Sequence, residues 1–310
     1  MIFAPGVGFS YPPVKVSWTK REAILFALSI GATQDELNLL YELHPDFTLF
    51  PTYPSVLQFK GGATDVVDFY AAQDSAVIPG IPKLDPTRAL DGERRLEVLC
   101  PLPTTSQGQD FMWHSKVIGV YDKGEKGTVL QHEYLLVEAG TGKAYSRLVG
   151  SGFFVGQGQW GGPKGLRAQL FPPPPGRESR PDAVYETRVG STSAHLYRLN
   201  GDYNPLHATP EPGEAIGLGG IIMHGLYTWN SVAHLLVQKL AGSDPSTLKE
   251  YGARMSAPVK PGMMLLTEVW RSGNFTNGWE DIRFRTSAGG VEVLSNGRAL
   301  IKCTSTIAKL

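Results

Sequence analysis

The sequence predicts an α+β fold, because strand-like and helix-like patterns both extend over long stretches of the chain. Segments rich in β-branched and aromatic residues, separated by glycine-containing turns such as 123–127 and 139–143, are typical of an antiparallel meander. Further strands are expected close to the C-terminus. The expected strands are 94–99, 113–121, 128–137, 145–155, 264–270, 279–286 and 291–306.

One long apolar stretch predicts a buried helix between the two groups of strands. It begins after His224-Gly225 and runs to Leu240 with apolar residues at roughly the i, i+3, i+4 spacing of a helix. Shorter helices are expected elsewhere, and the second of them starts with Thr33 and Glu36 in the spacing of a capping box. These helices are expected at 19–29, 33–44, 192–200 and, interrupted by Gly61-Gly62, at 54–72.

A change in composition divides the chain into two units. Residues 157–182 are rich in Gly and Pro and include the run Pro172 to Pro175, which indicates a semi-rigid connection. The expected units are therefore 1–156 and 183–310, on either side of a linker at 157–182. No internal repeat is visible in the sequence itself.

Composition excludes several classes of function. The chain has 310 residues with 29 basic and 29 acidic side chains, so no overall field would attract nucleic acid. We expect neither a membrane span, because no apolar stretch is long enough, nor a secretory leader. Cys100 and Cys303 show no metal-binding spacing and are expected to be buried free thiols.

The stretch from Tyr197 to His207 contains the candidate catalytic residues. Asp202, Asn204 and His207 bring a carboxylate, an amide and an imidazole within six residues, and these groups can hold and deprotonate one water molecule. Gly201 permits a positive φ, and Asn204 before a proline favours a turn. The pattern predicts addition or removal of water, although the same letters also suit an exposed surface turn.

The start of the buried helix favours the catalytic interpretation. His224-Gly225 would place free backbone N–H groups and the positive end of the helix dipole near that turn, where they suit a developing oxyanion. A helix start that merely needs a small residue for packing is the alternative. Asp202 and His207 supply only two metal ligands, so a zinc site is not expected.

These residues resemble a known family, the type-2 (R)-specific enoyl-CoA hydratases of the MaoC-like branch of the hot-dog superfamily. The family pattern, aromatic-x-Leu-small-Gly-Asp-x-Asn-Pro-Leu-His, is matched from Tyr197 to His207, with Asn200 where a smaller residue is usual. Met223-His224-Gly225-Leu226 is similar to its following helix start. Other similar landmarks are 27–32, 35–42, 49–53, 101–103, 122–124, 181–182 and 260–262.

The resemblance implies a double hot-dog fold, with two bent antiparallel sheets that each wrap round a central helix. It implies that the C-terminal unit is catalytic and that the N-terminal unit receives the acyl chain. The implied reaction is syn hydration of a trans-2-enoyl-CoA to the (R)-3-hydroxyacyl-CoA. In this reaction Asp202 and His207 would hold and activate the water, and Asn204 would orient it. Gly225, His224 and Gly201 would form the thioester side of the site, and no metal or other cofactor is implied.

The resemblance also suggests where the protein works. Members related to peroxisomal multifunctional enzymes act in β-oxidation, and Ala308-Lys309-Leu310 is similar to the Ser-Lys-Leu peroxisomal address, so we expect an import receptor as a partner. A homodimer is also expected, although no self-complementary surface can be identified in one sequence.

Two departures from the family pattern bear on the substrate. Asp91-Gly92-Glu93-Arg94 replaces the usual His-Gly-Glu-Gln, and bulky Tyr227, Trp229 and Asn230 replace small residues after the catalytic helix start. We expect Tyr227 to pack in the core. For Trp229, packing in the core and facing the acyl-chain tunnel both remain open. A biosynthetic enzyme for polyketide-type or branched acyl thioesters is therefore the alternative function. A non-catalytic acyl-CoA binding module is a third interpretation.

Overall fold

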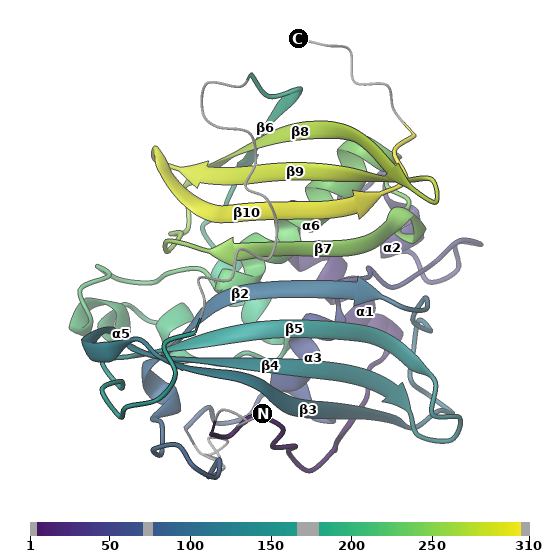
Figure 1. Ribbon diagram of the computed structural model, residues 1–310. Coiled ribbons are helices and arrows are strands. Elements are labelled where there is room, and N and C mark those ends of the chain that lie inside the picture. The colour runs from purple at the N-terminus through teal and green to yellow at the C-terminus, as the bar shows by residue number, and fades with distance from the viewer. Residues whose placement is uncertain (1–4, 71–76, 166–179, 305–310) are drawn as a thin grey trace.

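The computed structural model describes residues 5–70, 77–165 and 180–304, which form one ten-stranded antiparallel sheet with the main helices packed on one face (Figure 1). The strands follow the order β1-β3-β4-β5-β2-β7-β10-β9-β8-β6. Their bounds are β1 (Val14–Val16), β2 (Ala89–Val98), β3 (Phe111–Asp122), β4 (Gly127–Glu138), β5 (Ala144–Val155), β6 (Ala183–Arg188), β7 (Leu248–Met255), β8 (Met264–Thr276), β9 (Trp279–Ala288) and β10 (Val291–Ile301).

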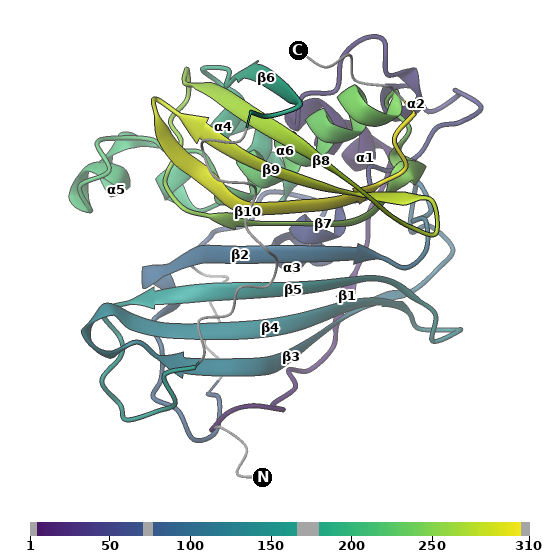
Figure 2. The ribbon, with the colours of Figure 1, turned by 45° about the horizontal axis from the view of Figure 1, so that its top comes forward.

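The strand order shows an internal duplication that is not visible in the amino-acid sequence. From the outer edge inward, the N-terminal half runs β1-β3-β4-β5-β2, and the C-terminal half runs β6-β8-β9-β10-β7 in the same relative order. The halves join where β2 pairs with β7, from Glu93 opposite Arg254 to Glu97 opposite Glu250 (Figure 2). The expected α+β double hot-dog fold is confirmed, with the two bent sheets continuous rather than separate.

The helices are α1 (Lys20–Ser29), α2 (Leu37–Leu40), α3 (Pro54–Lys60), α4 (Ser193–Tyr197), α5 (Pro210–Ala215) and α6 (Gly225–Ala241). α6 is the long buried helix that the apolar spacing predicted; it begins after His224 and ends at Gly242 in a left-handed conformation. α3 takes the equivalent place in the N-terminal half, between β1 and β2. The expected helices at 19–29 and 192–200 are confirmed by α1 and by α4 with the 3₁₀ turn that follows it.

Two expected helices were too long. The 33–44 helix shrinks to α2, because the buried Glu36 carboxylate turns to bind His234 and Gln238 of α6 as well as Thr33. The 54–72 helix ends at Lys60, because Gly61 adopts a positive φ and its N–H caps Leu57. The last two residues of the expected range, 71–72, lie outside the described residues.

Three strands were missed for physical reasons. β1 and β6 are short strands at the sheet edges, where one neighbour suffices to hold them. β7 carries Lys, Glu, Gly and Arg and lacks an apolar signature, yet it is central in the sheet. Its polar face is satisfied by ion pairs, since Glu250 binds Arg95 of β2 and Arg298 of β10, each at 2.8 Å.

Other sequence expectations have mixed outcomes. Cys100 and Cys303 are free thiols, but the expectation that they are buried was wrong, because each is only partly covered. No helix in the described part of the chain is long and apolar enough to cross a membrane.

The start of the linker folds back onto the first half, where backbone N–H groups of Gln159 and Gly161 donate to the Asp122 carboxylate. Pro172 to Pro175 lie outside the described residues, and the 1–156, 157–182 and 183–310 division stays a prediction.

The Glu36–His234 contact predicts a loss of stability in acid. Burial alone would raise the pKa of Glu36, but the hydrogen bond and charge of His234, 2.9 Å away, outweigh it and lower the pKa from 4.5 to about 2. The ionised carboxylate therefore stabilises the fold above pH 4.5, and this contribution is lost as the pH falls towards 2. We expect the free energy of unfolding to fall more steeply in this range for the wild type than for Glu36→Gln, measured by urea titration. Glu42→Gln, at an exposed position, is the control, and identical pH curves for Glu36→Gln and wild type would contradict the assignment.

Candidate active site

The motif loop is held against the N-terminal half of the molecule. Gly201 has φ +121°, and a Cβ placed there would lie 2.7 Å from Lys60 Cβ and 2.8 Å from Lys60 Cα and N. The absence of a side chain thus lets the loop pack directly on the end of α3. The positive φ expected for Gly201 is confirmed, and the close approach adds a second reason for glycine.

Local hydrogen bonds shape the turn after Gly201. The Asp202 carboxylate accepts from Asn204 N at 3.3 Å, and Asn204 Oδ1 accepts from Leu206 N at 3.0 Å. Pro205–His207 then form a 3₁₀ turn. The Asn204 side-chain oxygen thus caps this turn, and its expected contact with the substrate water stays a prediction.

His207 is oriented by a backbone carbonyl. Its ring is 7% exposed, and Nδ1 lies 2.9 Å from Ile222 O. A carbonyl oxygen can only accept, so Nδ1 carries the proton and the lone pair of a neutral ring is at Nε2. Burial lowers the pKa of His207, against the opposing charge of Asp202, and so favours this neutral, basic form.

His224 is a structural partner that sequence reasoning had placed only on the substrate side. Its ring is 2% exposed and stacks on His207 with centroids 3.7 Å apart. Nε2–H donates to Asp202 O at 3.1 Å, which ties the helix start to the motif loop. Burial first, and the nearby His207 second, hold the pKa of His224 well below its ordinary value, so the ring stays neutral.

The structure brings Asp202, His207 and His224 together, with one ligand-type atom of each within 4.8 Å of the others. The sequence alone indicated only two ligands, Asp202 and His207, and the structure adds His224 as a third. The geometry still fits a metal poorly, because an ion bound by both imidazoles must lie near both ring planes, and stacked rings keep their planes apart. The absence of a metal and of other cofactors stays a prediction.

Asp202 and His207 are electrostatically matched for proton transfer. Partial burial raises the pKa of the Asp202 carboxyl, and the negative charge of Asp91 adds to this, while His207 and Arg94 oppose it. Because burial lowers the pKa of His207, the affinities of the two groups for a proton approach each other. Because the charge of each group shifts the pKa of the other, the two groups do not titrate independently.

Gly225 is the first residue of α6 and carries one of the N–H groups that have no partner within the helix. A Cβ at Gly225 would lie 3.2 Å from Met255 Cγ and 3.8 Å from Asp91 Cβ. The helix start therefore abuts β7 and β2 at the junction of the two halves. An anionic oxygen at this end would be stabilised by the N–H groups and the helix dipole.

Two residues of the site come from the N-terminal half and were noted in the sequence only as departures. Asp91 and Arg94 of β2 form an ion pair at 2.8 Å, and the charges of both act on Asp202. Only the pairing of β2 with β7 brings them to α6, more than 100 residues away in sequence. In the sequence, the sign that these two residues belong to the site was that Asp91 and Arg94 replace the His and Gln that are usual in the family.

The bulky residues after Gly225 belong to the core. Tyr227 packs edge-on against Tyr197 with ring centroids 5.7 Å apart, so it lies in the core as expected. Trp229 packs edge-on against Tyr251 with ring centroids 4.6 Å apart, so it too is a core residue. Asn230 donates to the Tyr197 hydroxyl at 2.8 Å and to Ser55 Oγ at 3.1 Å. These contacts fix α6 against α3 and α4 rather than narrow a channel.

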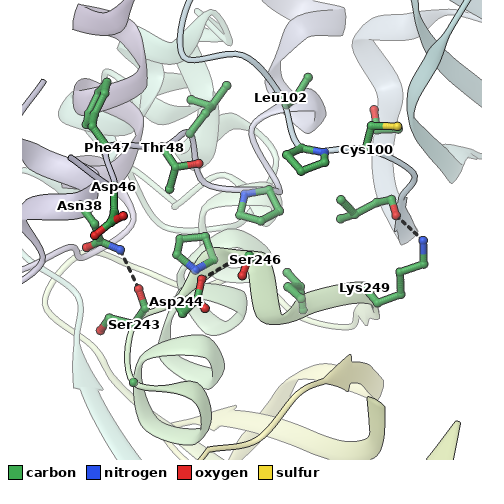
Figure 3. Close-up of a pocket in the computed structure, with 18 of the residues that line it drawn as sticks. Asn38, Asp46, Phe47, Thr48, Cys100, Leu102, Ser243, Asp244, Ser246 and Lys249 are labelled. Carbon is green, nitrogen blue, oxygen red and sulfur yellow. Dashed lines mark hydrogen bonds between the residues drawn. The ribbon is translucent and has the colours of Figure 1, made fainter. Parts of the chain in front are cut away.

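A separate groove of about 900 Å³ lies at the opposite end of α6, next to Gly242 (Figure 3). Its polar side chains hold neighbouring segments: Asn38 donates to Ser243 O at 2.9 Å, and Lys249 to Val98 O at 2.6 Å. α6 has 17 residues, so about 25 Å separates its ends. The groove therefore does not contain the Asp202–His207 pair.

Comparison with known proteins identifies the family. Residues 16–156 match the model described as MFE-2 hydratase 2 N-terminal domain, and residues 173–292 match the MaoC like domain. The chain belongs to the MaoC-like hydratase and dehydratase family. It is accordingly an enzyme of the hydro-lyase class.

Relatives of similar length support this membership. The chain is 48% identical to "Probable dehydratase NIT22" of Ajellomyces capsulatus over 95% of this chain and 81% of that protein. It is 32% identical to "Probable enoyl-CoA hydratase 2" of Dictyostelium discoideum, over 94% and 93%. A MaoC-like dehydratase structure from Phytophthora capsici superposes with a TM-score of 0.82 at 28% identity, over 96% of each chain.

Proposed function

We propose that this enzyme reversibly hydrates trans-2-enoyl-CoA thioesters to (R)-3-hydroxyacyl-CoA. The observation that carries the proposal is the convergence of the Asp202 carboxylate and the His207 imidazole at the start of α6. The printed names of the relatives, which include an enoyl-CoA hydratase 2 and a dehydratase, agree with it.

The residues have distinct roles in the proposed reaction. The thioester carbonyl oxygen accepts from Gly225 N–H at the end of α6, so the enolate charge that develops on it is stabilised. A water held between Asp202 and His207 adds its oxygen to C3 and gives up one proton to this pair. C2 receives a proton from the same pair, so both new bonds form on one face. Dehydration runs through the same atoms in reverse.

The test is direct. Loss of the absorbance of the conjugated enoyl thioester is followed with short, medium and long acyl chains, and the product is resolved by chiral chromatography. We expect turnover with at least one chain length and an (R) product. An (S) product would contradict the proposed stereochemistry but not the proposed hydration. Absence of turnover with every chain would favour the biosynthetic enzyme for polyketide-type or branched acyl thioesters, or the non-catalytic acyl-CoA binding module.

We also propose a peroxisomal location. It rests on relatives such as the "Peroxisomal multifunctional enzyme type 2" of Drosophila melanogaster, which is 32% identical over 94% of this chain but 47% of that longer protein. Ala308-Lys309-Leu310 lie outside the described residues. Imaging a fluorescent fusion with and without this tripeptide tests both the location and the import receptor. The homodimer stays a prediction that light scattering can test.

A further inference from the structure

Arg94 is a buried arginine on the inner face of the sheet, beside the proposed reaction centre. Its side chain is on the same face of β2 as the core residue Leu96 and is 6% exposed. The neighbouring strand position is Gly150, where a Cβ would lie 3.3 Å from Arg94 Nη1. The sheet therefore lacks a side chain where the guanidinium extends.

Most of this guanidinium is without a hydrogen-bond partner. Nη2 donates to Asp91 Oδ1 at 2.8 Å, whereas Nε and Nη1 are buried and have no partner among the described residues. The Tyr134 ring lies under the guanidinium, with its centroid 5.9 Å from Cζ. A buried donor without a partner destabilises the fold, and such groups in a native fold call for an explanation.

The position of the ion pair provides that explanation. Asp91 Cβ is 3.8 Å from the place that a Cβ on Gly225 would take, so the pair adjoins the proposed thioester oxygen site. Arg94 and Tyr134 belong to β2 and β4, two strands of the N-terminal half. An acyl chain that leaves Gly225 towards this half would meet the free donors of Arg94.

We propose that Arg94, held by Asp91, binds an uncharged oxygen acceptor on the acyl chain, and that the preferred substrate is an enoyl-CoA with a keto or hydroxyl group beyond C3. This inference rests on the proposed function and narrows its substrate class. Asp91 already neutralises the guanidinium, so a neutral acceptor completes its hydrogen bonds without adding a buried charge. A plain hydrocarbon chain would leave both donors unpaired.

The experiment compares kcat/KM for three enoyl-CoA esters of equal chain length: unsubstituted, keto-substituted and ending in a carboxylate. We expect the keto ester to be preferred over the unsubstituted one by roughly tenfold to a hundredfold, as one or two charge-assisted hydrogen bonds allow. The double variant Asp91→Asn/Arg94→Gln, which avoids an unpaired buried carboxylate, should bring this ratio close to one. Arg95→Gln is the matched control, because Arg95 is next in the same strand and binds Glu250 on the other face.

Each outcome decides a different point. A preference for the unsubstituted or the carboxylate ester, or a keto preference that survives in the double variant, would overturn the inference while the hydratase function stands. Absence of turnover with all three esters would instead count against the proposed function. In that case, or if the double variant fails to fold, calorimetric binding of the three esters to Asp202→Asn measures the same preference, and equal affinities would refute it.

Discussion

Asp202→Asn is expected to lower kcat by roughly 10²- to 10⁴-fold, the range that a general acid–base group contributes. The asparagine has the same shape, and its Oδ1 can still accept from Asn204 N, so the turn remains intact. The variant cannot take a proton from the water. His207→Ala is expected to have an effect of similar size, because it removes the lone pair at Nε2. The measurement is single-turnover kinetics with the best enoyl-CoA of the chain-length series.

The double variant makes this prediction sharper. Because Asp202 and His207 are proposed to act on one water, removing both should cost little more than removing either. Independent roles would give losses that multiply. Asp35→Asn and His114→Ala, both at exposed positions outside the site, serve as controls and should retain near wild-type rates. Near wild-type kcat in Asp202→Asn or His207→Ala would refute the roles given to them.

The sequence revealed the parts of the site whose geometry is local. Gly201, Asp202 and Asn204 interact within a few residues, so their types and spacing specify the turn. The start of α6 was equally visible, because apolar spacing and His224-Gly225 mark it directly. The stacking of His224 on His207 was not visible, since it depends on how the loop and the helix pack.

Non-local contacts account for what was missed. β7 has no apolar signature because its polar face is neutralised by Arg95 and Arg298 from neighbouring strands. The full length of α2 was mispredicted because Glu36 binds His234, almost 200 residues further along the chain, rather than only capping its own helix. The environment of Arg94 likewise exists only once β2 pairs with β7.

The duplicated architecture supports the proposal that only the C-terminal half carries the chemistry. α3 and α6 occupy equivalent places, but α6 begins with Gly225 and α3 begins with Pro54. A proline has no backbone N–H to donate, and α3 has only seven residues, so its end is a weaker site for an oxyanion. The C-terminal half also supplies the motif loop, which packs on α3. The N-terminal half thus positions the site and contributes Asp91 and Arg94 to its wall.

Gly201→Ala is expected to combine a large loss of activity with a clear loss of stability. At φ +121° an L-residue is strained, and the new Cβ would lie within 2.8 Å of three Lys60 atoms, two of which are backbone. We expect a cost of about 2–4 kcal/mol in the free energy of unfolding, from strain and overpacking together, and a fall in kcat of about a hundredfold as Asp202 shifts.

Gly108→Ala separates these two causes. Gly108 also has a positive φ, +83°, but no atom lies within 4 Å of a Cβ placed there. It should therefore show backbone strain alone, about 1 kcal/mol or a little more, with unchanged kcat. Urea unfolding and steady-state kinetics on both variants provide the comparison. Equal stability losses in the two, with full activity in Gly201→Ala, would mean that close packing of the motif loop on α3 does not position Asp202.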